Sequence, residues 1–377
     1  MEQSLENVLK NRIEQHGPMP FIDFMAACLY EPGQGYYTSP GRKVGAAGDF
    51  YTSISVHAAF GRVLAREITA MWHSLHCPSH FTLMEVGAGH GRLACDILDY
   101  LAECQPDCYQ TLSLILVDQE PTLIEAQQTT LKAHSNKVTS MTPEQARSQS
   151  FVGVLYSNEL IDAMPVHRVI MTSQGLKEIY VGHDGNQFID LLQEPSTPRL
   201  TEYLDSYAIP LHPGQEAEIS LAAIDWLNDM YQVLTAGFIM TIDYGWAKAQ
   251  LYAPERKLGT LLCYHQHTVE DNPYIRIGQQ DITTHINFSA LLERGEELGL
   301  ETIWFGDQSR FLLNAGILEE LEAMEASGAP EKERLKFRLA LKRLIMPEGG
   351  MGDTFRVLVQ AKAVEKPLLR CQQGLTS

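Results

Sequence analysis

The most constraining feature of this chain is a largely apolar run that leads into three alternating glycines and then into a helical pattern. Residues 81–86 form the run, Gly87, Gly89 and Gly91 follow, and apolar residues recur at helical spacing from Leu93. This order is typical of a parallel strand that passes into its crossover helix in a doubly wound sheet. Glycines there allow a sharp turn and let a ligand approach the bare main chain. The sequence therefore predicts an α/β fold with a Rossmann-like, nucleotide-binding core.

The spacing of this corner favours one cofactor. A dinucleotide fingerprint reads G-x-G-x-x-G/A, and its last position falls on Arg92, which is too large for close helix–strand packing. The motif reads instead E-x-G-x-G-x-G, and Glu85 is its acidic residue. S-adenosylmethionine carries an ammonium and a sulfonium but no phosphate, so a carboxylate suits it better than a pyrophosphate. We expect S-adenosylmethionine to contact Glu85, Gly87, Gly89 and Gly91; purely structural glycines are the alternative.

The next strand supplies another candidate contact. The run over 111–117 is nearly all apolar, as buried parallel strands are, and it ends on Asp118. A carboxylate at this point can accept hydrogen bonds from both ribose hydroxyls of an adenosine. The alternative is that Asp118 caps a helix that begins near Pro121, and both roles can coexist.

Composition restricts the partners and the compartment. The 377 residues hold 29 Lys and Arg against 47 Asp and Glu, a formal net charge of −18. Such a surface repels phosphate backbones, so we expect no nucleic-acid partner. No apolar run is long enough for a membrane span. Residues 1–11 resemble neither a secretion signal nor a transit peptide, and the seven scattered cysteines indicate reduced thiols, so a cytoplasmic protein is expected.

One short cluster of metal-ligand residue types needs an explanation. It contains His73, His76, Cys77 and His80. No second ligand pair stands at the spacing of a zinc finger, and Pro78 interrupts the local helix. We therefore expect no metal site.

Hydrophobic patterns divide the chain into five segments. Residues 1–75 are expected to form an N-terminal helical layer with a lid, and 76–165 the first half of the cofactor-binding core. Short strands with hairpin turns predict an antiparallel β-hairpin insertion over 166–215. Residues 216–365 are expected to complete the core with helical insertions, and 366–377 to form a tail.

Seven strands are expected in the core sheet. They span about 81–86, 112–117, 137–140, 151–156, 237–242, 301–305 and 355–361. A helix followed by a closing strand pair fits the seven-stranded sheet of class I methyltransferases, whose last strand inserts antiparallel. A long polar loop is expected to precede residue 285.

Polar residues follow the fourth strand at the edge where ligands bind in open α/β sheets. Ser157, Asn158 and Glu159 come directly after its apolar residues. Methyl transfer is an in-line displacement at carbon, and orientation can supply roughly 7–11 kcal/mol of its barrier. Asn158 and Glu159 are therefore candidate catalytic residues that orient a basic nitrogen. Capping of a helix over 160–163 is the alternative.

The segment 280–288 is also dense in polar groups. His285 could donate or accept a hydrogen bond at the substrate, with an ordinary pKa of about 6.5. It is the third catalytic candidate. The alternative is that Asp281 or Thr284 caps the following helix and His285 lies in its first turn.

Six motifs occur together in one known family. They are G-D-F-Y-T-S at 48–53, E-V-G-A-G-H-G at 85–91, S-N-E-L-I-D-A-M-P-V-H at 157–167, D-Y-G at 243–245, G-T-L at 259–261 and Q-D-I-T-T-H at 280–285. In this order, over roughly residues 10–360, the chain resembles the class I methyltransferases of the mitochondrial complex I assembly-factor type. It is identified as a bacterial member of this mitochondrial dysfunction A group; a eukaryotic member would lie in the mitochondrial matrix.

The resemblance implies S-adenosylmethionine binding and, for the mitochondrial members, symmetric dimethylation of an arginine on a respiratory complex I subunit. It implies that Gly48, Asp49, Phe50 and Thr52 belong to a lid over the cofactor.

The resemblance also suggests roles at the substrate. Asn158 and Glu159 resemble the second acidic arm with which arginine methyltransferases hold a guanidinium, and His285 with the preceding threonine resembles their threonine–histidine loop. Ser150 stands about where the first glutamate of the acidic pair is expected. A single remaining carboxylate supports an alternative, a non-catalytic assembly factor that binds a partner protein. In both cases we expect a protein segment as the partner, received by the lid and by the insertion over 166–215.

Overall fold

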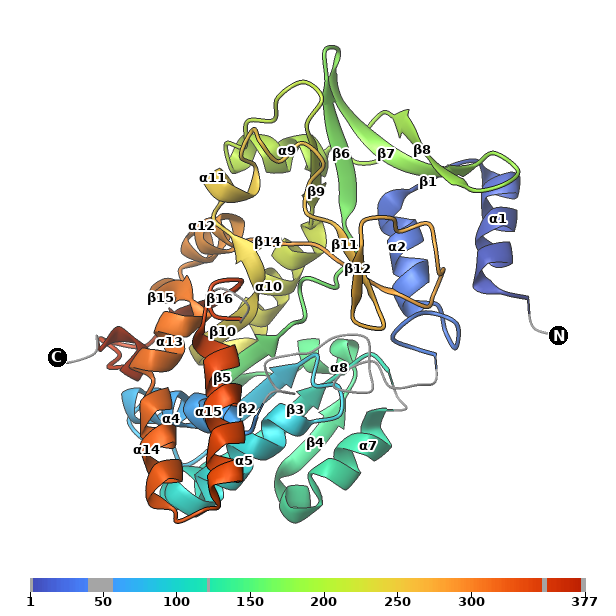
Figure 1. Cartoon of the computed structure of the whole chain (residues 1–377). Coiled ribbons are helices and arrows are strands. Elements are labelled where there is room, and N and C mark those ends of the chain that lie inside the picture. The colour runs from blue at the N-terminus through green and yellow to red at the C-terminus, as the bar shows by residue number, and fades with distance from the viewer. Residues whose placement is uncertain (1–2, 40–56, 121–122, 348–350, 374–377) are drawn as a thin grey trace. The chain divides into compact units, whose positions relative to one another are not determined.

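The computed structural model describes residues 3–39, 57–120, 123–347 and 351–373, and the chain forms two compact units (Figure 1). Each unit is assembled from three stretches of the chain. We call them the insertion unit (Met1–Tyr51, Ile161–Trp226 and Gly245–Glu293) and the core unit (Thr52–Leu160, Leu227–Tyr244 and Arg294–Ser377).

A largely parallel sheet forms the centre of the core unit. Its strand order is β15-β16-β10-β5-β2-β3-β4, and β16 runs antiparallel to both of its neighbours. The strands are β2 (Phe81–Val86), β3 (Leu112–Val117), β4 (Val138–Met141), β5 (Phe151–Asn158), β10 (Leu234–Trp246), β15 (Glu301–Asp307) and β16 (Phe355–Lys362). The seven predicted strands and the antiparallel last strand are therefore confirmed, and the two-residue β14 (Ile286–Asn287) adds an eighth strand beside the end of β10.

Helices supply the rest of the core unit. They are α4 (Ala59–Ser74), α5 (Arg92–Cys104), α6 (Pro106–Thr111), α7 (Leu123–Thr130), α8 (Pro143–Arg147), α13 (Gln308–Asn314), α14 (Ile317–Ala326) and α15 (Glu331–Ile345), with short 3₁₀ turns η1 (Lys132–Lys137) and η2 (Arg370–Gln372). One buried apolar cluster contains residues of α4, α5, α13 and α15 together with the central strands. The amphipathic pattern of α5, with Leu93, Ile97, Leu98 and Leu101 buried, places its apolar face in this cluster.

The insertion unit contains two smaller antiparallel sheets. The larger combines β1 (Met19–Pro20), β6 (His167–Thr172), β7 (Gly175–His183), β8 (Phe188–Gln193) and β9 (Glu216–Ile219), and the smaller combines β11 (Leu262–His265), β12 (Thr268–Glu270) and β13 (Asp281–Thr283). Its helices include α1 (Leu5–His16), α2 (Phe21–Tyr30), α9 (Arg199–Ser206) and α11 (Lys248–Leu251). Helices α10 (Leu221–Val233) and α12 (Phe288–Leu298) belong partly to each unit, and β14 (Ile286–Asn287) pairs with the end of β10.

Three features differ from the expected segments. Helix α4, expected in the N-terminal layer, packs in the core unit because its apolar face joins the sheet cluster. The antiparallel sheet continues past residue 215, since β9 pairs with β6. The expected polar loop before residue 285 contains the small β11–β13 sheet, whose strands are too short to leave a clear alternating pattern.

Two glycines in the central strands have no room for a side chain. Gly237 of β10 lies opposite Gly153 of β5. A Cβ on Gly237 would overlap the Gly153 carbonyl oxygen, and one on Gly153 would overlap that of Thr82. The obstacle is backbone in both cases, so a side chain cannot be accommodated by a rotamer change.

Gly237→Ala is expected to lower the free energy of unfolding by about 3 kcal/mol or more, because a central strand pair must separate. The matched control is Gly328→Ala, which has a left-handed φ of +71° and nothing within 4 Å of the new Cβ. It should cost only about 1 kcal/mol. Urea unfolding measures both, and equal losses would contradict the steric argument.

Candidate functional site

The three glycines of the turn after β2 have different surroundings. All have left-handed φ values, +77° at Gly87, +51° at Gly89 and +73° at Gly91. A Cβ on Gly87 would lie 2.8 Å from Leu160 Cδ1, and one on Gly91 3.1 Å from Leu131 Cδ1. Among the described residues, a Cβ on Gly89 would meet nothing within 4 Å. Gly89 therefore borders space that no described residue fills, where a ligand can lie against the main chain.

Asp118 follows β3 and holds the same turn. Its Oδ2 accepts a hydrogen bond from the Gly89 N–H at 3.0 Å, and its Oδ1 accepts one from the Glu120 N–H at 3.1 Å. Burial raises the pKa of Asp118, and these N–H groups oppose that shift. A carboxylate has about four acceptor positions, so capacity for ribose hydroxyls remains beside these two hydrogen bonds.

Glu85 is a buried carboxylate near the end of the central strand. It is 2% exposed, and its Oε2 accepts a hydrogen bond from the Tyr156 hydroxyl at 3.0 Å. Within the described residues it has no ion-pair partner. Burial raises its pKa to about 8, although the Tyr156 hydroxyl and the Ala94 N–H lower it. Near neutral pH the group is thus poised to ionise when a cation approaches.

Unsatisfied polar atoms lie at the end of β5. Ser157 Oγ and Asn158 Oδ1 are buried and have no hydrogen-bond partner within the described residues. Ser157 is paired with Val86, the last residue of β2, so these atoms belong to the strand edge that carries the glycine turn. Buried polar atoms without partners are rare in folded proteins, and they fit a bound polar molecule.

Glu159 has an unusual backbone conformation. Its φ of +52° is left-handed, which is uncommon for a residue other than glycine. The Glu159 N–H donates to the Ile242 carbonyl at 3.0 Å, and the Leu160 N–H donates to Asp243 Oδ2 at 3.1 Å. No helix begins at Leu160, so helix capping by Asn158 and Glu159 is wrong. Strained backbone of this kind clusters at functional sites.

Ser150 does not lie near Glu159. It precedes the first residue of β5, whereas Glu159 follows the last one, about 30 Å away along an extended strand. Its hydroxyl bonds that of Thr235 at 2.9 Å. The expectation that Ser150 takes the place of a first glutamate is therefore wrong. Asp243 of the neighbouring strand β10 holds the residue after Glu159, since its Oδ2 accepts from the Leu160 N–H.

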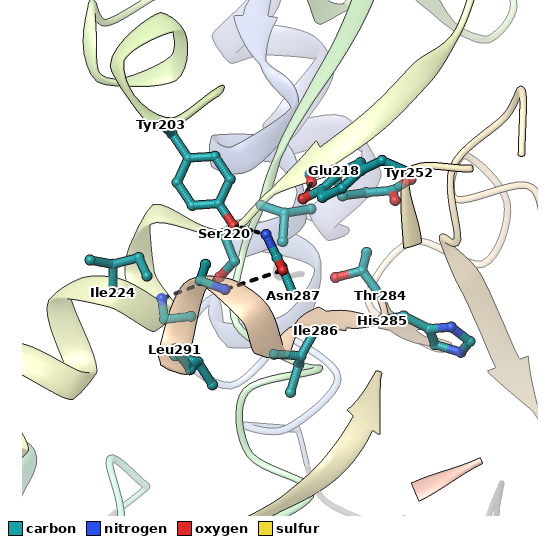
Figure 2. A pocket seen from close by; sticks show the side chains of 13 residues that line it. Tyr203, Glu218, Ser220, Ile224, Tyr252, Thr284, His285, Ile286, Asn287 and Leu291 are labelled. Atoms are coloured by element: carbon teal, nitrogen blue, oxygen red, sulfur yellow. Dashed lines mark hydrogen bonds between the residues drawn. The ribbon is translucent and has the colours of Figure 1, made fainter. Parts of the chain in front are cut away.

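His285 belongs to the insertion unit and lines a small cavity there (Figure 2). The Trp246 indole N–H donates to His285 Nδ1 at 2.9 Å. Burial and the charge of Arg256 lower the pKa of His285 to about 4. The ring is therefore neutral at pH 7, and since Nδ1 accepts a hydrogen bond, its own proton is on Nε2. His285 can donate a hydrogen bond, but a general base at Nδ1 is excluded.

The helix after His285 begins later than expected. Helix α12 starts at Phe288, and Asn287 Oδ1 accepts from the Ala290 N–H at 3.2 Å. Asp281 lies in strand β13 instead. The alternative that Asp281 or Thr284 caps a helix containing His285 is therefore wrong.

A buried carboxylate holds the His285 loop. Glu218 Oε2 accepts hydrogen bonds from the Thr260 N–H at 2.9 Å and from the Thr260 hydroxyl at 3.0 Å. Thr260 Oγ1 in turn accepts from the His285 N–H at 3.0 Å, and the Asp162 carbonyl accepts from the Thr284 N–H at 3.0 Å. Sequence patterns gave no reason to single out Glu218, whose role depends on contacts across more than 40 residues. The adjoining cavity measures about 20 Å³, room for about one water molecule.

Comparison with known proteins identifies the family. A family model described as "Putative S-adenosyl-L-methionine-dependent methyltransferase" matches residues 63–306, more than half of the chain. The chain belongs to this family. Its cofactor is S-adenosylmethionine, as the glycine turn predicted. A Burkholderia thailandensis protein, whose crystal structure is bound to S-adenosyl-homocysteine, has 30% sequence identity to this chain. The two structures match with a TM-score of 0.88 over 98% of this chain and 95% of that chain.

Curated relatives support the resemblance found in the motifs. The protein arginine methyltransferase NDUFAF7 homolog of Drosophila melanogaster is 26% identical, and the match covers 96% of this chain and 85% of that protein. Human NDUFAF7, also called a mitochondrial protein arginine methyltransferase, is 25% identical over 92% of this chain and 81% of its own. This methyltransferase is thus related over nearly its whole length to the group that its motifs resemble.

Some predictions from the sequence concern residues that the structure does not describe. The lid residues Gly48, Asp49, Phe50 and Thr52 lie outside the described residues, so their cofactor contacts stay a prediction.

In the described part of the chain, no three His, Cys, Asp or Glu side chains are grouped to hold a metal ion. No helix found there is both long and apolar enough to cross a membrane.

Gly89→Ala is expected to fold but to lose affinity for S-adenosylmethionine. The new methyl group points into open space in the ligand-free methyltransferase, at a backbone cost of about 1 kcal/mol, and would occupy the space of the cofactor. Calorimetric titration should show at least about a tenfold increase in Kd. Unchanged affinity would contradict the placement of the cofactor at Gly89.

Glu85→Gln is expected to change how stability depends on pH. Below pH 4.5 Glu85 is protonated in both folded and unfolded chains; between 4.5 and about 8 only the unfolded chain has lost the proton. Folded-state stability from this group is therefore lost as pH rises through that window, by roughly 1.4 kcal/mol per pKa unit at most. The glutamine variant keeps an acceptor for Tyr156 and lacks this loss. Thermal unfolding of both ligand-free proteins between about pH 6 and pH 8 measures this difference. The same dependence of stability on pH in the wild type and in Glu85→Gln would refute the raised pKa of Glu85.

Proposed function

We propose that this methyltransferase transfers methyl groups to an arginine side chain of a protein. The resemblance of its motifs implies symmetric dimethylation of a respiratory complex I subunit, and we propose this reaction as the specific case. The observation that carries the proposal is Glu159, a partly exposed carboxylate in a left-handed conformation at the end of the strand beside the glycine turn. The relatives called protein arginine methyltransferases support the choice of acceptor. The partner would then be a protein segment.

A guanidinium matches the chemistry available at Glu159. Its planar fork binds one carboxylate in bidentate fashion, and it is charged at neutral pH. Asn158 Nδ2 donates to Glu159 Oε1 at 3.1 Å, which orients the carboxylate. Asp243 accepts N–H groups from Leu160 and Tyr244, which fixes the turn that presents Glu159. Glu159 would hold the fork and direct one nitrogen toward the sulfonium methyl.

The cofactor residues would act as follows. Gly89 would lie against S-adenosylmethionine, with Gly87 and Gly91 shaping the turn. Asp118 would accept the ribose hydroxyls, and Glu85 would ionise in the field of the cationic donor. The lid at 48–53 would cover it. The cofactor supplies the methyl group on its sulfonium, and these residues would bind and orient it.

His285 would support the substrate as a hydrogen-bond donor. Its ring is neutral, and Trp246 fixes its orientation through Nδ1. The Glu218–Thr260 pair fixes its backbone. The alternative of a non-catalytic assembly factor rests on the missing first glutamate; the position of Ser150 at the opposite end of β5 shows only that Ser150 does not stand in its place.

Glu159→Gln is expected to keep cofactor affinity and to slow methyl transfer. Loss of one charge-assisted contact costs roughly 1.5–3 kcal/mol, about one to two decades in rate. Glu144→Gln on the exposed helix α8 is the matched control. The assay follows labelled methyl groups from S-adenosylmethionine into proteins from cells that lack the gene. Transfer at an unaltered rate would show that Glu159 has another role.

The acceptor itself is tested by mass spectrometry. Proteins from cells with and without the gene are compared for a lost methyl mark. The proposal expects the mark on arginine, on a single protein or a few. A lost mark on a carboxylate or another oxygen would overturn the choice of arginine while leaving the methyltransferase family unaffected.

A further inference from the structure

The main chain of Gly89 is held on two sides. Its N–H donates to Asp118 Oδ2 at 3.0 Å, and its carbonyl accepts a hydrogen bond from Gln127 Nε2 at 2.9 Å. The Ser140 hydroxyl donates to Gln127 Oε1 at 2.7 Å. Both polar ends of the Gln127 amide are thus satisfied, and the amide has one orientation.

Gln127 is unusual for a helical glutamine. It belongs to α7 and is 1% exposed, whereas its neighbour Gln128 is exposed. The third glycine of the motif lies beside it: a Cβ on Gly91 would be in ordinary contact with Gln127 Cγ at 3.7 Å and tight against Leu131 Cδ1 at 3.1 Å. The bare backbone at Gly91 therefore lets Leu131, the residue after α7, pack against the turn that Gln127 reaches.

This arrangement bears directly on cofactor binding. Gly89 borders the open space of the turn, and a glycine there samples many backbone conformations unless contacts restrict it. A site that is already ordered binds its ligand more tightly, because less freedom is lost on binding. We propose that Gln127 is a positioning residue for S-adenosylmethionine: it fixes the Gly89 carbonyl, and Ser140 fixes Gln127.

The first test removes the Gln127 contact. Gln127→Met keeps the length of the side chain and removes both hydrogen bonds, and Gln128→Met is the matched control on the same helix. Calorimetry with S-adenosylmethionine and with S-adenosylhomocysteine should show Kd raised about tenfold for the first variant and unchanged for the control. Wild-type affinity in Gln127→Met would overturn the proposal, whatever the fate of arginine as the acceptor.

A second variant separates positioning from a general loss of stability. Gln127→Glu keeps the size and the acceptor for Ser140, but an ionised carboxylate cannot donate to the Gly89 carbonyl. Its protonated form can, so the ratio of its Kd to the wild-type Kd should fall toward one as pH is lowered. The Gln127→Met ratio should stay constant over the same range. A ratio for Gln127→Glu that does not respond to pH would contradict the donor role.

Ser140 supplies the third test, because it acts only through Gln127. Ser140→Ala alone should raise Kd about threefold. Added to Gln127→Met, it should change Kd no further, since the amide it orients is gone. Additive effects of the two substitutions would show that Ser140 acts on the cofactor by another route and would remove the relay from the proposal.

Discussion

The rest of this site depends on one buried carboxylate. It lies near the end of the central strand and has no cationic partner among the described residues. Glu85 is 2% exposed and bonded to the Tyr156 hydroxyl, and burial raises its pKa to about 8. Burying such a group disfavours its charged form. A ligand that carries positive charge favours the ionised form of Glu85, whereas a pyrophosphate would keep the group protonated. The chemistry of the strand end thus suits a sulfonium cofactor.

The parallel register brings the other functional groups to the same edge. Ser157 is paired with Val86 on one side and with Thr241 on the other. The glycine turn after β2, Glu159 after β5 and Asp243 within β10 therefore lie next to one another although they are distant in sequence. Each glycine then has its own task. Gly87 faces Leu160, Gly91 makes room for Leu131, and Gly89 is the one of the three that meets no described residue on its Cβ side.

Features with a local signature could be predicted from the sequence. The seven strands, the glycine turn and Asp118 follow from apolar runs and from turn residues at fixed spacing. The anchoring groups could not, because their burial depends on distant contacts: Gln127 resembles any polar residue of an amphipathic helix, and Glu218 any charged residue of a short strand. Ser150 was misplaced for a different reason: its role was inferred from a motif spacing, although the predicted strand over 151–156 already separates it from Glu159.

The most direct test of this account is the proton balance of cofactor binding. Calorimetry at about pH 7 in buffers that differ in ionisation enthalpy counts the protons that S-adenosylmethionine displaces. With the pKa of Glu85 at about 8 in the ligand-free protein, binding should release close to one proton, and Glu85→Gln should release none. NAD should not bind. Tight binding of S-adenosylmethionine with the same proton count in both proteins, or binding of NAD in its place, would contradict the central role of this carboxylate.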